Sequence, residues 1–579
     1  MESYLFFAIE LAGVKINGRE FTRTDLSTIT CEINKAFPMP VFIIFKYGEK
    51  ITISIINRQL NKKDETRDVL KKVTLIKDIE TANPKRSQIE ILNDLSLDTL
   101  YKKHKFENFV ELHRAWTATL DTKELNKRFF RELSNWYFWA ITKVEFPNDE
   151  KADKDTHHAT GVIRLITRLM FVWFLKEKGL IEEDIFNRRR LQDILNFNDE
   201  SAFYKAILQN LFFATLNTDT TDGKTKRRFE TVAERKNNLN HSFFRYESEF
   251  INPEKALRDY FFKVPFLNGG LFECLDRPEE KVFIDGFNEE ESNALSVPDE
   301  LFFSDYCEAP ELNEVYDTKN KKYEVRGLIQ ILDNYKFTIA ENTPLEEEIA
   351  LDPELLGKMF ENLLANYNPE TKTTARKQTG SFYTPREIVD FMVDESLIAY
   401  LKGKLQTETK GFTMAVAFGS NQPTFFGNEG RRQLAFEERF SVNRWLGKDK
   451  ELESALHKLF AYNDRNPFSD NETETEILIK AINDCKIIDP ACGSGAFPMG
   501  ILHRLVFLLS KLDKDNVKWR ELQRQIAVKE TEEAFNIGDV EERQKRLIEI
   551  NEVFDLNASD YGRKRRTEIL KTNRPGQNR

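Results

Sequence analysis

Cysteine is scarce in this sequence, and no metal-binding spacing is present. Only five cysteines occur in 579 residues, and no two of them form a CxxC pair. The seven histidines show no zinc-ligand spacing either. A sparse and odd number of cysteines is typical of a reducing compartment, so we expect a cytoplasmic protein without a disulfide framework. The cysteines are Cys31, Cys274, Cys307, Cys485 and Cys492.

Long apolar runs and a phosphate-binding loop are also absent. The longest strongly apolar run, Leu169–Leu175, is much shorter than the ~18 residues that indicate a membrane-spanning helix. We therefore expect no membrane association. No GxxxxGK[ST] string occurs, which excludes an ATP-driven motor of the P-loop type in this chain.

The charge balance excludes a protein that is basic overall. The formal net charge is -10, and the charged residues, 31% of the chain, are of both signs and interspersed. A local basic cleft that contacts nucleic acid remains compatible with this composition. Two basic runs, Arg188–Arg190 and Lys224–Arg228, are expected to be solvated surface, with phosphate contact as the alternative.

The chain is long enough for roughly three domains, and the first, residues 1–82, has the pattern of a small α/β unit. Residues 4–11 predict a strand, residues 24–37 a helix, and residues 41–56 two strands around a turn at Tyr47–Glu49. A nuclease core needs an acidic residue followed by a Glu-x-Lys string on adjacent strands, but Glu10 is followed by Leu-Ala and the hairpin segment Ile53–Ile55 carries no acidic residue. We therefore expect this unit to have a packing role.

Residues 83–345 predict a mainly helical second domain. Asp121 and Glu124 have the spacing of a capping box at the start of a helix with a wide aromatic face. That face could stack on bases, but core packing is the favoured interpretation. Residues 161–179 are apolar nearly all round, which predicts a buried central helix ending at Gly179.

Residues 346–579 contain a glycine-rich stretch, IIDPACGSGAFPMG, between two apolar segments. Lys486–Asp489 has a buried-strand pattern, and Phe497–Leu512 has the apolar spacing of a helix. Strand, glycine turn and helix together predict the first βα unit of a doubly wound sheet, where ligands bind beyond the strand ends. Residues 402–470 have many turn residues and weak periodicity, which predicts a loop insertion of unknown role.

The residue types in the glycine turn indicate which ligand it suits. Gly493 and Gly495 allow the backbone to approach a ligand where a Cβ atom would collide. Asp489 places a carboxylate beside the turn, which suits a cationic group better than a phosphate. No lysine or arginine lies within the turn, while free helix N–H groups would donate hydrogen bonds to a carboxylate or hydroxyl.

Two strings resemble motifs of a known enzyme family. DPACGSGAF resembles the S-adenosylmethionine motif of the adenine-specific, amino-group DNA methyltransferases. TGSFYTPREIVDFMVDESL resembles the motif that closes over the methionine end of that cofactor, and predicts a helix starting near Pro385. DPELLGKMFENLLA, residues 352–365, resembles the helix that leads into this motif. The order of the two motifs is that of the γ class.

The resemblance extends over most of residues 1–564 and is to bacterial type IIG-like restriction–modification and phage-defence methylases. It implies a Rossmann-like methyltransferase domain, S-adenosylmethionine as cofactor and double-stranded DNA as partner. The cofactor-binding residues that it implies are Phe382, Tyr383, Thr384, Pro385, Asp489, Pro490, Ala491, Cys492, Gly493, Ser494, Gly495 and Phe497.

The family's catalytic string, [ND]-P-P-[YF], does not occur in this sequence. In the family its polar side chain and the first proline carbonyl accept hydrogen bonds from the target amino group, and its aromatic ring stacks on the flipped base. The nearest string, Asn466-Pro467-Phe468, lacks one proline and precedes the glycine turn, so we interpret Asn466 as a loop residue. No catalytic residue is assigned.

The end of the chain also departs from the family pattern. A polar helical stretch, residues 518–554, is followed by a basic tail, residues 565–579, where an apolar strand with an acidic residue would be expected. Such a tail resembles what a frameshift or premature stop leaves, and the chain also begins almost within a strand. We therefore expect an incomplete methyltransferase domain, truncated before the catalytic motif.

These observations predict a methyltransferase component that is inactive as this chain alone. A partner carrying the C-terminal methylase half, or a helicase or nuclease partner, would complete the system. The alternative is a non-catalytic fragment that binds DNA or protein. Methylation of protein or RNA is disfavoured by the γ-type motif order and the long helical region.

Overall fold

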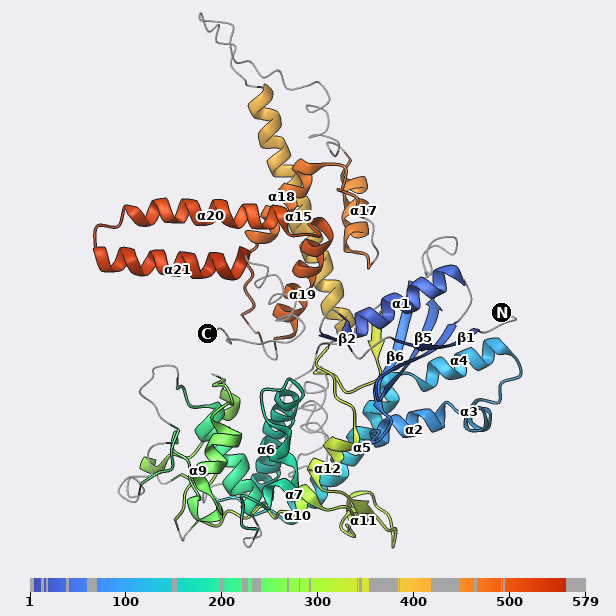
Figure 1. Ribbon diagram of the computed structural model, residues 1–579, viewed down its shortest axis with the longest axis vertical. Helices are drawn as coiled ribbons and strands as arrows, with labels where there is room; N and C mark the ends of the chain where they lie inside the picture. Colours follow the sequence, from blue (N-terminus) through green and yellow to red (C-terminus); the bar gives the residue numbers. More distant parts are fainter. Residues whose placement is uncertain are drawn as a thin grey trace, which may run out of the picture. The chain divides into compact units, whose positions relative to one another are not determined.

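The chain forms two compact units, Met1–Ser381 and Phe382–Arg579, each described here by itself (Figure 1). The boundaries predicted at about residues 82 and 345 stay a prediction. This computed structural model describes residues 5–11, 15–16, 19–37, 41–59, 70–147, 154–197, 201–220, 227–231, 241–267, 270–280, 282–290, 293–340, 342, 346–353, 384, 386–417, 445, 448–462, 466–490, 492 and 495–558.

A five-stranded mixed sheet begins the first unit. Its strands lie in the order β1-β4-β5-β6-β9. β1 is parallel to β4 and β6 to β9, while the β4–β5 and β5–β6 pairs are antiparallel. The bounds are β1 Leu5–Glu10, β4 Val41–Tyr47, β5 Lys50–Gln59, β6 Leu70–Glu80 and β9 Glu346–Glu348. The sheet is therefore completed by a strand that follows a long helical excursion of the chain.

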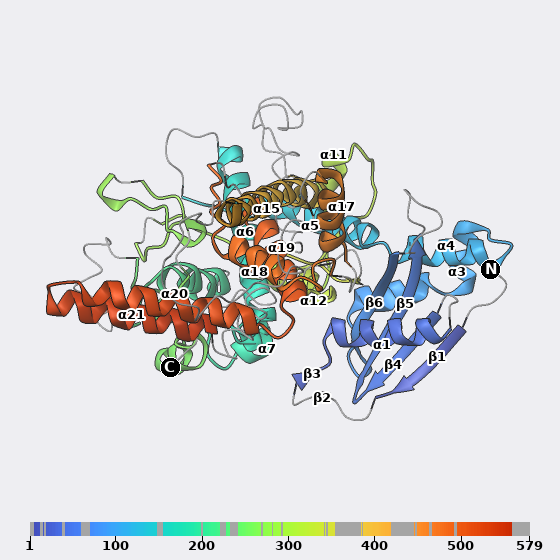
Figure 2. The same ribbon diagram turned by 90° about the horizontal axis from the view of Figure 1, so that it is seen from above.

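The elements predicted for residues 4–56 are confirmed. Helix α1, Arg23–Ala36, starts at a capping box formed by Thr22 and Asp25. The turn between β4 and β5 has Gly48 at φ 55°, a conformation that favours glycine. Figure 2 shows α1 lying across one face of the sheet, with α3 and α4 on the other. Apolar side chains on both faces are buried, so this sheet has a packing role on each side.

The rest of the first unit is mainly helical, as predicted. Its α-helices are α2 Arg86–Asp94, α3 Leu97–His104, α4 Phe109–Thr119, α5 Thr122–Ile141, α6 Lys154–Glu177, α7 Arg188–Leu191, α9 Pro253–Ala256, α10 Glu300–Phe303, α11 Leu312–Val315 and α12 Leu328–Asn334. A π-helix, η2, covers Phe203–Leu216, and further short helices are η1 Glu183–Phe186, η3 Glu247–Glu249, η4 Leu257–Phe261, η5 Gly270–Phe272 and η6 Pro278–Glu280. Two small antiparallel ribbons pair β2 Lys15–Ile16 with β3 Arg19–Glu20, and β7 Cys307–Glu308 with β8 Glu324–Val325.

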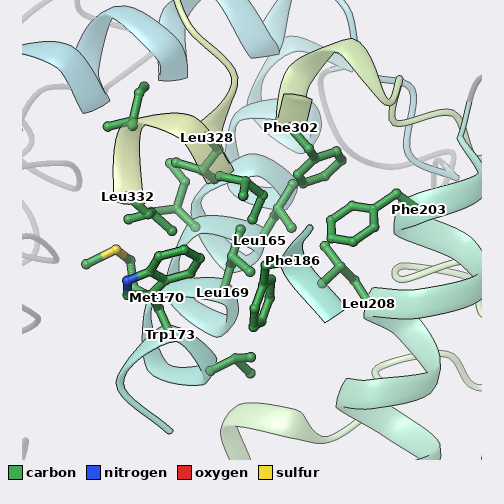
Figure 3. Close-up of a cluster of buried hydrophobic side chains, with 14 of the residues drawn as sticks. Leu165, Leu169, Met170, Trp173, Phe186, Phe203, Leu208, Phe302, Leu328 and Leu332 are labelled. Atoms are coloured by element: carbon green, nitrogen blue, oxygen red, sulfur yellow. The ribbon is translucent and has the colours of Figure 1, made fainter. Parts of the chain in front are cut away.

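The helix α6 lies at the centre of this unit's core, which confirms the predicted buried central helix. Figure 3 shows Leu165, Leu169 and Trp173 of α6 facing side chains from η2, α10 and α12. The stretch His157–Glu177 is long and apolar enough to cross a membrane, but 78% of its apolar window is buried inside the protein. The aromatic face of α5 is also buried, so core packing is confirmed over an exposed stacking platform.

The prediction of a capping box at the start of α5 is wrong, whereas the predicted end of α6 is confirmed. Asp121 is the N-cap of α5, and its side chain accepts a hydrogen bond from the Lys123 N–H at 2.9 Å. Glu124 does not complete a capping box, because its carboxylate pairs with Lys127 at 2.7 Å instead. Gly179, just beyond α6, has φ 67° and marks the end of that helix as predicted.

The regular secondary structure in the described residues of the second unit is all helical. Its helices are α15 Arg386–Ala417, α17 Asp449–Phe460, α18 Glu472–Asn483, α19 Ala496–Leu512, α20 Val517–Phe535 and α21 Val540–Ala558. Leucines from α15, α17, α18 and α19 form one core, and α20 and α21 lie side by side as a hairpin (Figure 1). Helices thus occupy parts of the range predicted as a loop insertion, and the polar stretch 518–554 is helical as expected.

Candidate cofactor site

The helices that follow the two motifs pack against each other in parallel. On α15, Val389 lies against Gly500 of α19, where a Cβ atom would be 2.9 Å from the Val389 Cγ1 atom. Further along both helices, Asp394 of α15 pairs with Arg504 of α19. Because the contacting residues advance in the same direction along both helices, the two N-termini lie at the same end of the pair.

The Asp394–Arg504 contact is a two-point ion pair in a largely buried setting. The Arg504 Nη2 atom donates to Asp394 Oδ2 at 2.6 Å, and Nε lies 2.5 Å from Oδ1. The Arg504 side chain is only 6% exposed. Burial raises the pKa of Asp394 above its usual range, while the Arg504 charge opposes that shift.

Aromatic rings complete the surroundings of Arg504. Its guanidinium carbon lies 4.7 Å from the ring centre of Tyr462 and 5.6 Å from that of Phe507. The Nη1 atom donates to the Phe460 carbonyl at 3.4 Å. Arg504 therefore joins α15, the end of α17 and α19 at one point. Burial also raises the pKa of the Tyr462 hydroxyl.

The described residues of both motifs lie at the shared N-terminal end of the helix pair. Thr384 comes two residues before the start of α15, and Gly495 is the N-cap of α19. Cys492 is exposed and free, and its carbonyl accepts the Gly495 N–H at 2.8 Å. Phe497, in the first turn of α19, packs partly buried against the helical core.

Gly495 has the open backbone that the sequence predicted for the glycine turn. Its φ is 82°, and no atom lies within 4 Å of the position that a Cβ atom would take. Its carbonyl accepts the Met499 N–H at 3.0 Å, which starts the helix. The conformation thus favours glycine, and the space in front of this backbone is unoccupied by the described residues.

The prediction of a strand at Lys486–Asp489 is wrong. The segment has no regular secondary structure, and Ile488 is 89% exposed and Ile487 47% exposed. A strand needs a neighbour to accept its backbone hydrogen bonds and apolar cover for its side chains. The described residues of the second unit provide no strand, so the doubly wound sheet predicted from this segment is not formed there. Asp489 itself is half-buried, and Pro490 is exposed in the following turn.

Several predicted residues lie outside the described part of the chain. The same holds for residues 354–365 of the predicted helix at 352–365 and for the basic tail at 565–579. The site residues concerned are Phe382, Tyr383, Pro385, Ala491, Gly493 and Ser494.

The interpretation of Asn466 as a loop residue is confirmed. Its side-chain oxygen accepts the Phe468 N–H at 3.0 Å, and its amide nitrogen donates to the Lys511 carbonyl at 3.4 Å. Both contacts hold a turn before α18. Within the described ranges, no group of histidine, cysteine and acidic residues could hold a metal ion.

Sequence reasoning missed three residues that align the two motif helices: Asp394, Gly500 and Arg504. A signal was present, because each interrupts an apolar stripe with a charge or a missing side chain. Two apolar residues of α15, Ile388 and Met392, do not pack inward, since each is 49% exposed. The face of α15 that packs inward instead continues through Leu397 and Leu401.

Comparison with known proteins finds a distant relative. A protein of Methanocaldococcus jannaschii, named "Putative type II restriction enzyme and methyltransferase", is 24% identical over 437 residues. The alignment covers 75% of this chain but only 27% of that protein, so the chain spans about a quarter of the relative's length. No family model matches the sequence, and no solved structure matches it. The chain is therefore similar to a restriction–modification methyltransferase over most of its own length.

Proposed function

We propose that this chain is the cofactor-binding part of an S-adenosylmethionine-dependent DNA methyltransferase of a restriction–modification or phage-defence system. The methyl acceptor would be the exocyclic amino group of adenine in double-stranded DNA. The carrying observation is the parallel pair α15–α19, which has the ends of both motifs on the same side. The name of the M. jannaschii relative supports the same activity class.

The residues at this end fit the cofactor's methionine moiety. Asp489 offers a carboxylate to its ammonium group, and the first turn of α19 offers backbone N–H groups to its carboxylate. The bare backbone at Gly495 leaves space for close approach. The cofactor would supply an electrophilic methyl group, and this chain's residues would bind and orient it.

Under this proposal the chain is inactive by itself, because it has no [ND]-P-P-[YF] string to hold the target amino group. Transfer needs the acceptor nitrogen in line with the methyl group, and orientation is the main contribution of the enzyme. A second polypeptide with a C-terminal methylase half would provide that string. A helicase or nuclease is the other partner class proposed for such a system, and the cytoplasm is the proposed compartment.

A non-catalytic fragment that binds DNA or protein is the alternative. The segment Lys486–Asp489, which forms no strand and leaves Ile487 and Ile488 exposed, favours it, because an incomplete sheet would weaken the cofactor pocket. The two proposals differ in one property: the first requires cofactor binding, and the second does not.

The test combines cofactor binding with methyl transfer by the purified chain. Equilibrium dialysis with labelled S-adenosylmethionine measures binding, and mass spectrometry of digested duplex DNA measures N6-methyladenine. We expect saturable binding without methylated adenine. Methylation by the chain alone would contradict its inactivity, and DNA binding without cofactor binding would support the fragment.

A further inference from the structure

We infer that the Asp394–Arg504 ion pair is a positioning device that holds the two cofactor motifs at a fixed spacing. Neither residue is among the predicted cofactor-binding residues, and neither would touch the cofactor. The inference rests on the proposed function for its link to S-adenosylmethionine. Its structural part, that the pair aligns the start of α15 with the start of α19, stands independently.

The placement of the pair supports this role. Asp394 lies eight residues after the first residue of α15, and Arg504 lies eight residues after the first residue of α19. Each is therefore about two turns from the start of its helix. Val389 and Gly500 make the second contact, closer to the motifs. Two contacts along parallel helices fix both their axial offset and their separation.

The chemistry of Arg504 makes the alignment specific. The Arg504 guanidinium donates a hydrogen bond to Asp394 Oδ2 and lies 2.5 Å from Oδ1, so the pair resists sliding of one helix along the other. Its side chain is almost fully buried, and a buried charge without its partner is strongly unfavourable. The helices consequently have one favourable register, the one that brings Thr384 and Gly495 to the same end.

A second ion pair on α15 offers a matched control. Lys402 of α15 binds Glu453 of α17 at 2.8 Å, with the Glu453 side chain 48% exposed. It also joins two helices of this unit, but on the surface and away from the motifs. Exposed pairs of this kind contribute little, so Glu453→Gln should leave the motif ends unchanged.

Hydrogen exchange tests the alignment without any cofactor. In Asp394→Asn, we expect backbone amides of residues 386–390 and 496–500 to exchange at least roughly fivefold faster than in the parent. Amides of α20 and α21 should keep their rates, as should every region in Glu453→Gln. Unchanged exchange at the two helix starts, or an equal increase throughout the unit, would overturn the inference.

Replacing both charges separates positioning from stability. Single removal of Asp394 leaves Arg504 buried and unpaired, whereas Asp394→Leu with Arg504→Met removes both charges and should restore the unfolding midpoint. We expect this double variant to bind S-adenosylmethionine at least roughly fivefold more weakly than the parent. Recovery of affinity together with stability would show a purely structural role and overturn the positioning role.

The two proposals fail in different ways. If the parent chain binds no S-adenosylmethionine, the proposed function loses its cofactor, while the exchange experiment still decides whether the pair aligns the helices. If the parent binds the cofactor and Asp394→Asn changes neither local exchange nor affinity, the proposed function stands and the positioning inference is wrong.

Discussion

Val389 of α15 lies directly against Gly500 of α19, with a hypothetical Cβ at position 500 only 2.9 Å from Val389 Cγ1. Gly500→Ala should therefore force the helices apart and lower the free energy of unfolding by about 1 kcal/mol or more. Gly403, also within α15, has no atom within 4 Å of its Cβ position. Gly403→Ala should raise stability by up to about 1 kcal/mol, and urea unfolding of both variants gives the comparison.

A rescue experiment accompanies this pair. Adding Val389→Ala to Gly500→Ala should recover part of the lost stability, because the smaller side chain leaves room for the new methyl group. If the changes in the free energy of unfolding caused by Val389→Ala and Gly500→Ala simply add in the double variant, the helices do not meet at this point.

Gly495 combines a left-handed backbone with open space, so its substitutions should act through backbone strain alone. Gly495→Ala should cost about 1–2 kcal/mol, because φ 82° is unfavourable for a residue with a Cβ atom. Gly495→Asn should cost less, since asparagine tolerates this region better. Chemical denaturation of the two variants measures the difference, and equal stability of all three proteins would exclude the left-handed conformation.

Asp78 in the first unit should contribute to stability against acid. Burial disfavours its charged form, but the ion pair with Lys77 and the hydrogen bonds from Lys77 and Tyr47 outweigh this and lower its pKa. Since the folded pKa lies below the unfolded value of about 3.9, this stability is present above that pH and is lost as the pH falls through the folded pKa.

The variant Asp78→Asn should therefore show a smaller loss of stability than the parent between neutral pH and about pH 3. Glu10, which forms an exposed pair with Lys46 at 3.1 Å, provides the comparison as Glu10→Gln. Surface pairs contribute little to stability, so Glu10→Gln should lose stability with falling pH to the same extent as the parent. Circular dichroism during acid titration reports the result, and parallel curves for all three would contradict this role of Asp78.

The arginines of the two basic runs, Arg188–Arg190 and Lys224–Arg228, should differ in role, because some make buried structural contacts and others are exposed. Arg227 donates to the backbone carbonyls of Phe261 at 2.6 Å and Val264 at 2.8 Å, so Arg227→Ala should destabilise the first unit. Arg189 is exposed on α7, where the phosphate-contact alternative remains open. If it binds phosphate, Arg189→Ala should reduce the salt slope of DNA affinity by about 0.9, as measured by fluorescence anisotropy.

Local patterns predicted most of the helices because their cause is local. Apolar spacing, the N-cap at Asp121 and the glycine after α6 each act within a few residues, and the structure confirms them. The failures depended on distant partners. Glu124 found Lys127 instead of the helix start, and Lys486–Asp489 had a strand pattern that no neighbouring strand in the described residues supports.

The candidate site shows the same division. Sequence alone indicated the glycine turn at Gly495 and the helix start after Thr384, since both depend on short motifs. It did not predict the Asp394–Arg504 pair, which joins residues far apart in the chain. A charge within an apolar stripe indicates a buried partner, but one sequence does not identify which residue that partner is.

Calorimetric titration of the purified chain with S-adenosylmethionine tests the central claim most directly. We expect saturable binding by the parent, weakened roughly tenfold or more in Asp489→Ala because a charged hydrogen bond to the ligand is lost. Asp484→Ala, which removes an exposed carboxylate five residues earlier, should bind like the parent. Absence of binding by the parent, or equal affinity of both variants, would contradict a cofactor site at this end of α15 and α19.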